Sequence, residues 1–231
     1  MEKINWWMRE NRVSIGMTLV AAVAIAWTGI IFEQSVFRII PLFVSLIVGL
    51  LQTKANRYAC LLGGFNSLIY AAVYVSFGLY ASAASALLIS CPFQLVTFVR
   101  WSKHAYRHST EFRKLTRRGW LVMVLLFAVS FVGMYMLLSV ADSKHRLWDI
   151  AGTLVGFFVS VLTLLGYREY TWLILPSAFL SFGLNVSLML EDMAQITYVI
   201  YSLHSMLCQF FQFFSVRRLY QEQQTQKGEE V

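Results

Sequence analysis

The sequence contains few charged residues. Asp, Glu, Lys and Arg make up only 13% of its 231 residues, whereas 58% are hydrophobic. A soluble domain of this length carries about 25% charged residues, so this chain cannot cover a surface that faces water. Its three prolines and thirteen glycines also exclude a collagen-like or disordered chain. The composition therefore predicts an integral membrane protein.

The motifs of metal sites and of common enzymes are missing. The three cysteines lie far apart in apolar runs, without metal-ligand spacing, and their odd number argues against a disulfide framework. There is no phosphate-binding loop, no HExxH motif and no recognisable nucleophile–base pair. We therefore predict no cofactor, no metal and no enzymatic activity. The net charge of +7 is confined to loops between apolar runs, which argues against a nucleic-acid partner.

Eight apolar runs approach the length of about 20 residues that a membrane-spanning helix needs. The second and the sixth are short, and the third and fourth are separated only by "SFGLY", which predicts a tight helical hairpin. The first run lacks a small-residue cleavage site, so we expect no cleaved signal peptide. The predicted spans are Val13–Phe32, Val36–Leu51, Tyr58–Phe77, Tyr80–Val99, Trp120–Val140, Ile150–Gly166, Thr171–Leu190 and Met193–Val216.

The basic residues predict the orientation. With the N-terminus in the cytoplasm, all of the 19 lysines and arginines except Arg38, Lys144 and Arg146 fall in cytoplasmic segments. The positive-inside rule favours this arrangement, in which both termini are cytoplasmic. The basic stretch from Arg100 to Arg118 is then a cytoplasmic loop. We interpret it as an anchor on an anionic leaflet rather than as a ligand site.

A faint internal repeat is visible. "FVSLIVGLL" (43–51) is similar to "FVSVLTLLG" (158–166), and Gln94 and Gln209 have the same separation as these segments. Spans two to four would then recur as spans six to eight, as two parallel copies. The predicted regions are an N-terminal segment with an extra helix (1–34), a first three-helix repeat (35–101), a basic loop with a linker helix (102–147), a second repeat (148–216) and a cytoplasmic tail (217–231).

The residues deep inside the spans are neutral. No Asp, Glu, Lys or Arg lies well away from a span end, which argues against a proton-coupled carboxylate relay. Amide side chains suit an uncharged ligand with hydroxyl and amide groups, and aromatic faces suit a flat ring. The polar residues at depth are Asn66, Gln94, Ser181, Asn185, His204 and Gln209, accompanied by Tyr70, Tyr74, Tyr198 and Tyr201.

Each of these residues has a second interpretation. Amides in membrane helices also join helices to one another, with about 0.6 to 2 kcal/mol for each hydrogen bond, and for a single residue we weigh both roles equally. Gln94 is favoured as a ligand contact because Pro92 frees backbone groups beside it. A lone histidine such as His204 is more often a packing residue. Gly63 and Gly64 predict a close contact between helices.

A resemblance to a known family emerges from these residues. The run "NRYACLLGGFNSLIYAAVYVSFGLYASAASALLISCPFQLVTFVRW" resembles the PnuC-type vitamin transporters, and "WDIAGTLVGFFVSVLTLLGYREYTW" and "YSLHS" extend the resemblance to residues 35–216. The matching features are Gly63 or Gly64, Tyr70, the turn Gly78–Tyr80, Pro92, Gln94, Trp101, Trp148, Asp149, Glu169 and Trp172.

The resemblance implies a SWEET-like three-plus-one-plus-three fold with an extra N-terminal helix, and a homotrimer. It also implies facilitated diffusion of nicotinamide riboside, with trapping by a cytoplasmic kinase. Leu175 stands where the family tends to have a second tryptophan, and Ser85, Ala86 and Leu87 stand where it tends to have an asparagine. His204 replaces an asparagine of the last span. These departures leave thiamine, riboflavin and deoxynucleosides open as substrates.

We therefore predict an all-α integral membrane protein with eight spans in a bacterial inner membrane. It would transport a ribosylated vitamin or nucleoside by rocking of the two repeats. Its partners would be a small-molecule substrate and the lipid bilayer. The alternative is a structural membrane protein without a ligand. The predicted substrate-binding residues are Asn66, Tyr70, Gln94, Trp172, Asn185, Tyr201 and His204.

Overall fold

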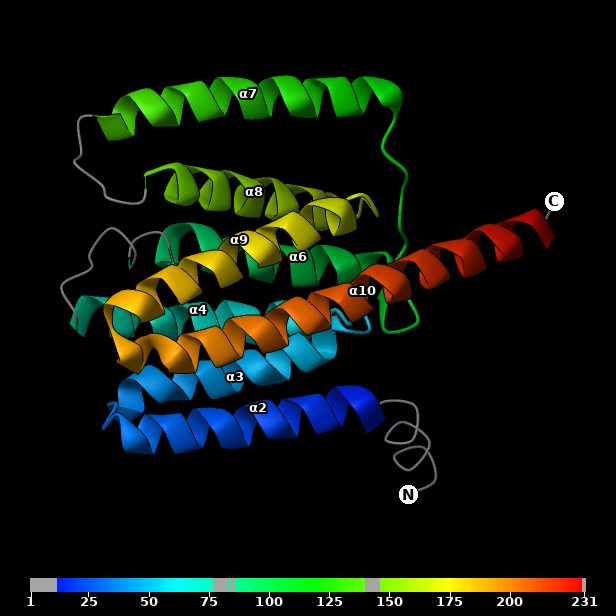
Figure 1. Ribbon diagram of the computed structural model, residues 1–231. Helices are drawn as coiled ribbons and strands as arrows, with labels where there is room; N and C mark the ends of the chain where they lie inside the picture. Colours follow the sequence, from blue (N-terminus) through cyan, green and yellow to red (C-terminus); the bar gives the residue numbers. More distant parts are fainter. Residues whose placement is uncertain (1–11, 77–82, 84–85, 140–145, 230–231) are drawn as a thin grey trace.

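The chain folds into a bundle of long helices (Figure 1). The computed structural model describes residues 12–76, 83, 86–139 and 146–229. Within these residues the prediction of an all-α membrane protein is confirmed. The α-helices are α2 (Arg12–Ile31), α3 (Val36–Gln52), α4 (Tyr58–Ser76), α6 (Cys91–Lys103), α7 (Arg117–Ser139), α8 (Arg146–Leu165), α9 (Tyr170–Glu191) and α10 (Ile196–Glu229).

Each predicted span overlaps one of these α-helices, and α10 extends well beyond the predicted end of the last span at Val216. Within the described part of the fourth span, a π-helical turn, η1 (Ala86–Ser90), leads into α6, and a short 3-10 turn, η2 (Met193–Gln195), precedes α10. Among the described residues, α2, α9 and the helix that includes α10 are long and apolar enough to cross a membrane by length and composition alone. The predicted turn Gly78–Tyr80 and the side chains of Tyr74, Trp148 and Asp149 lie outside what the structure describes.

Two sets of three helices pack in the same way. The middle helix of each set contacts both of the others, so α4 packs against α3 and α6, and α9 packs against α8 and α10. The first helix of each set also contacts the last helix of the other set, because α3 contacts α10 and α8 contacts α6. Helix α2 lies against α3 and α10, and α7 packs against α8 at the opposite side of the bundle (Figure 1).

Two glycines allow α6 to lie close to α4, as the sequence predicts. A Cβ atom on Gly63 would come within 1.9 Å of Gln94 Oε1, and one on Gly64 within 2.9 Å of Leu95 Cδ2. Side chains larger than hydrogen would therefore push the two helices or their side chains apart.

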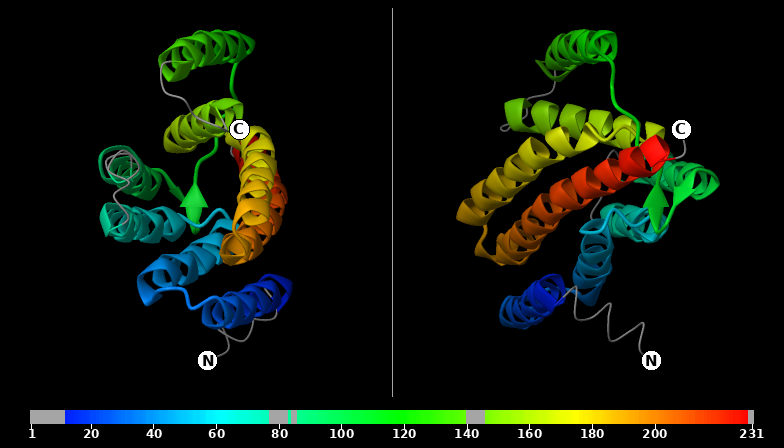
Figure 2. Two further views of the ribbon diagram at one scale, coloured as in Figure 1. Left: turned by 60° about the vertical axis from the view of Figure 1, so that its left-hand side comes forward. Right: turned by 90° about the vertical axis from the view of Figure 1, so that its right-hand side faces the viewer.

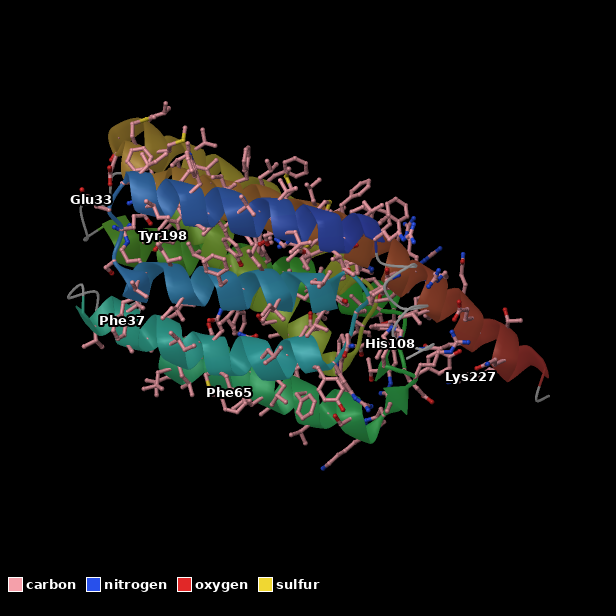
Figure 3. The ribbon with its side chains drawn as sticks, turned by 90° about the horizontal axis from the view of Figure 1, so that it is seen from below. Glu33, Phe37, Phe65, His108, Tyr198 and Lys227 are labelled. Carbon is pink, nitrogen blue, oxygen red and sulfur yellow. The ribbon has the colours of Figure 1, made fainter. Side chains whose placement is uncertain are left out.

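One end of the bundle carries a small β-hairpin, which the sequence analysis does not predict. Strands β1 (Ala105–Tyr106) and β2 (Ser109–Thr110) pair antiparallel beside the far end of α10 (Figure 2). The predicted tail is helical as far as Glu229. Gln223, only 3% exposed, fixes it there, because its amide donates to Thr110 O and accepts from Phe112 N, both at 2.9 Å. We call this the basic end; Figure 3 shows His108 and Lys227 there, and Glu33 at the opposite end.

Candidate functional site

A polar cavity of about 230 Å³ lies between the second half of α3, the middle of α4, the start of α6 and the start of α10. We call it the central cavity. It combines side chains from three helices of the first set with the start of α10 from the second. Its lining residues are Ser45, Val48, Gly49, Gln52, Gly63, Asn66, Ser67, Tyr70, Gln94, Tyr201 and Ser205.

Asn66 is the most constrained polar group of the cavity. Its Nδ2 donates to Pro41 O at 3.1 Å and to Ser45 Oγ at 2.7 Å, so it joins α4 to α3. Its Oδ1 is buried and, among the described residues, has no hydrogen-bond partner. An unpartnered buried acceptor costs about 1–3 kcal/mol. In this structure the Asn66 amide therefore serves as a contact between α4 and α3, and its oxygen would meet a ligand only if the side chains that cover it moved.

Gln94 is held by its neighbours on α4. Its Nε2 donates to Ser67 Oγ at 3.0 Å, and that hydroxyl donates in turn to Gly63 O at 3.0 Å. The bare backbone at Gly63 leaves room for the Gln94 amide. The π-helical turn η1 ends just before Pro92, and such turns recur at functional sites because they disturb the regular helical hydrogen bonds. The irregularity expected beside Pro92 is therefore present.

Two tyrosines complete the cavity. The Tyr70 hydroxyl lies 3.4 Å from Ser45 Oγ, and the Tyr201 hydroxyl is within hydrogen-bonding reach of Ser45 and Ser205. The Ser45 hydroxyl thus lies within hydrogen-bonding reach of the Asn66 amide and of both tyrosine hydroxyls. The phenol rings add aromatic surface to a lining that otherwise consists of amides, hydroxyls and small residues.

Three predicted residues are not part of the cavity lining, although His204 packs against Gly49 of that lining. His204 is 3% exposed, and its Nε2 lies 3.0 Å from Thr18 Oγ1, which joins α10 to α2. The Asn185 amide donates to Ser181 O of its own helix at 2.9 Å. Trp172 lies at the basic end, in a second pocket. The structure thus brings Asn66, Tyr70, Gln94 and Tyr201 together and leaves these three apart.

The sequence analysis missed the hydroxyl groups of the cavity. Ser45, Ser67 and Ser205 resemble ordinary small packing residues in an apolar helix, so their type carries no signal. A weaker signal was present in the spacing, because Pro41, Ser45 and Gly49 recur every four residues on one face of α3. Residues at that spacing share a helix face, and this face borders the cavity.

Among the residues that the structure describes, the cavity lining is electrically neutral and includes no Asp, Glu, Lys, Arg or His. In the described part of the chain, no three His, Cys, Asp or Glu side chains are grouped as a metal site would require. The arrangement can hold a small ligand by hydrogen bonds and ring contacts.

Comparisons with known proteins agree with this arrangement. The family model described as nicotinamide mononucleotide transporter matches residues 35–215, from the start of α3 into α10. The crystal structure of the vitamin B3 transporter PnuC is similar to this fold, with a TM-score of 0.75 and 20% sequence identity. The alignment covers 94% of this chain and 98% of that one. No curated protein sequence matches the chain.

Proposed function

Because the chain belongs to the nicotinamide mononucleotide transporter family, we propose that it takes up a nucleoside-like vitamin of the nicotinamide riboside type. The observation that carries the proposal is the central cavity, whose described lining consists of amides, hydroxyls, phenol rings and small residues. The hydroxyls of a ribose and the carboxamide of the vitamin can form hydrogen bonds with such amides and hydroxyls. The amide of Gln94 offers a further polar contact.

The size and charge of the cavity favour a nucleoside over a nucleotide. Its volume of about 230 Å³ lies just below the range of about 300–1,000 Å³ for ligand pockets, which suits one ring and one sugar. A phosphate needs arginine, lysine or several backbone donors, and the described lining residues include no cationic side chain. The pyridinium ring of nicotinamide riboside is cationic, and the faces of Tyr70 and Tyr201 attract such a ring.

The transport mechanism that fits this cavity is alternating access without ion coupling. The reciprocal contacts of α3 with α10 and of α6 with α8 support two parallel repeats that rock against each other. The repeats correspond to the regions 35–101 and 148–216. We further propose a bacterial inner-membrane location with cytoplasmic termini, supported by the distribution of basic residues. Assembly as a homotrimer and trapping of the substrate by a cytoplasmic kinase complete the proposal.

Ligand-induced thermal stabilisation of the purified protein tests the substrate, since a ligand that binds only the folded state raises its stability. The panel contains nicotinamide riboside, nicotinamide mononucleotide, thiamine, riboflavin, nucleosides and deoxynucleosides. We expect nicotinamide riboside to stabilise the protein and the mononucleotide to bind about tenfold more weakly or worse, because its phosphate lacks a cationic partner. Equal affinity for both would contradict the nucleoside assignment, and stabilisation by another compound alone would replace it.

The variant Gln94→Ala links binding to the cavity. It removes an amide that lines the cavity, so affinity should fall about tenfold. The matched control is Gln226→Ala, which removes the same kind of amide at the basic end, where Gln226 accepts a hydrogen bond from the Tyr106 hydroxyl. Uptake into proteoliposomes should likewise fall in Gln94→Ala and stay at the wild-type rate in Gln226→Ala. Wild-type affinity in Gln94→Ala would make Gln94 a helix contact only, and no binding by any compound would favour a structural protein.

A further inference from the structure

A second pocket, of about 200 Å³, lies at the basic end between the first turn of α9 and the distal part of α10. We call it the arginine pocket. It shares no lining residue with the central cavity, so the proposed transport site does not account for it. Its lining residues are Arg168, Thr171, Trp172, Arg217 and Gln221.

The two guanidinium groups of the pocket are positioned by aromatic rings. Arg168 lies over the ring of Tyr220 at 4.1 Å, and its Nε donates to Glu169 Oε1 at 3.3 Å. Arg217 lies over Trp172 at 4.8 Å and over Phe213 at 4.3 Å. Within the described residues, no carboxylate forms an ion pair with Arg217, so the pocket has an excess of positive charge. Planar guanidinium groups held in this way suit a phosphate ligand.

The exposed face of α10 leads directly into the arginine pocket. Residues three or four apart on a helix share a face. Along one such line on α10, the exposed side chains change from apolar to polar. The line is apolar through Phe210 and Phe214, and from Arg217 onward it is polar. On a helix that crosses a bilayer, such a change marks the boundary between hydrocarbon and headgroups. The line consists of Leu203, Leu207, Phe210, Phe214, Arg217 and Gln221.

The exposed side chain of Trp172 indicates the same boundary between hydrocarbon and headgroups. That side chain is 52% exposed and meets the ring of Phe213 edge to face, with the ring centroids 5.4 Å apart. An exposed indole is typical of the headgroup level of a membrane, where its apolar body and its N–H each find a suitable environment. The arginine pocket therefore places two guanidinium groups beside the exposed ring of Trp172. The apolar part of the exposed line on α10 begins next to it.

We propose that the arginine pocket binds the phosphate of an anionic membrane lipid, whose acyl chains lie along Phe214 and Phe210. Arg217 and Arg168 hold the phosphate, and Thr171 and Gln221 are the neutral polar groups at its side. Basic pockets between spanning helices bind such headgroups by charge attraction. Phosphatidylcholine has a compensating positive charge, so the pocket favours phosphatidylglycerol over it.

Lipid binding to the purified protein in detergent, measured by native mass spectrometry, tests the proposal. We expect phosphatidylglycerol to bind more tightly than phosphatidylcholine, and Arg217→Gln to weaken phosphatidylglycerol binding about tenfold. Arg217 is exposed, so this variant should fold normally. The matched control is Lys103→Gln, an exposed residue of α6 at the same end, which removes the same charge outside the pocket. It should leave binding unchanged.

Four results would overturn the proposal. Equal losses in Lys103→Gln and Arg217→Gln would show a general effect of surface charge rather than a pocket. Equal affinity for the two lipids would remove the role of headgroup charge. Inorganic phosphate or glycerol 3-phosphate that displaces the lipid at similar concentrations would identify a site for free phosphate compounds. If phosphatidylglycerol binding survives both Arg217→Gln and the double variant with Arg168→Gln, the pocket holds no lipid phosphate.

Discussion

The first set of helices (α3, α4 and α6) and the second set (α8, α9 and α10) pack alike, but they use their polar side chains differently. In the first set, Asn66 and Gln94 form hydrogen bonds to neighbouring helices beside the central cavity. In the second set, Ser160 and Asn185 donate to carbonyls of their own helices, and the bond from Gln212 Nε2 to the Tyr170 hydroxyl, which joins α10 to α9, lies outside the cavity lining. The first set thus supplies most of the recognition groups of the cavity.

Ser45 and Ser160 illustrate this difference in hydrogen bonding between the two sets. They occupy matching positions in the two similar segments, 43–51 and 158–166. Ser45 meets Asn66 and Tyr70 across helices, whereas the Ser160 hydroxyl is satisfied by the carbonyl four residues earlier. A serine in a helix can always bond back in this way, and it bonds across only where a partner approaches. Specificity therefore depends on which helices come close, more than on which residues are polar.

The largest expected effect comes from Asn66→Ala. This change removes the hydrogen bonds to Pro41 O and Ser45 Oγ, so the free energy of unfolding should fall by about 2 kcal/mol, and affinity for the substrate should fall about tenfold or more. Asn185→Ala is the matched control in the second set and should change neither quantity much. Thermal unfolding and ligand titration measure both. Similar losses in the two variants would abolish the distinction between the sets.

A smaller effect on stability, but a clear effect on binding, is expected from Gly63→Ala. The new Cβ would meet Gln94 Oε1 at 1.9 Å, and the flexible amide can move away. Stability should therefore change by less than about 1 kcal/mol, because alanine also favours the helix. Ligand affinity should fall about tenfold as the amide leaves its position.

Gly156→Ala in α8 is the control for Gly63→Ala, since no atom of the described residues lies within 4 Å of its added Cβ. It should bind the substrate normally and unfold at the same or a slightly higher temperature. Normal binding by Gly63→Ala would mean that the Gln94 amide can shift without consequence for the ligand, and would weaken the assignment of recognition to the first set.

The difference between the sets also explains what the sequence could predict. The spans follow from long apolar runs, and the cavity amides stand out because amides are rare in such runs. Trp172 and Asn185 lie on α9, which is apolar all round, so no periodicity indicates which of its faces points inward. The hairpin and the distal part of α10 depend on Gln223 meeting Thr110 and Phe112, contacts between segments far apart in the sequence.

The smallest expected effect comes from Thr18→Val. This variant tests whether His204 only joins helices or also contributes to ligand binding. Thr18→Val removes the hydroxyl that lies 3.0 Å from His204 Nε2 and keeps the shape of the side chain. The free energy of unfolding should fall by about 1 kcal/mol, while substrate affinity should stay at the wild-type value because neither residue lines the central cavity. A loss of affinity measured by titration would show that α2 positions the binding groups of α10 through this hydrogen bond. The second set would then contribute to recognition through His204 as well as through Tyr201.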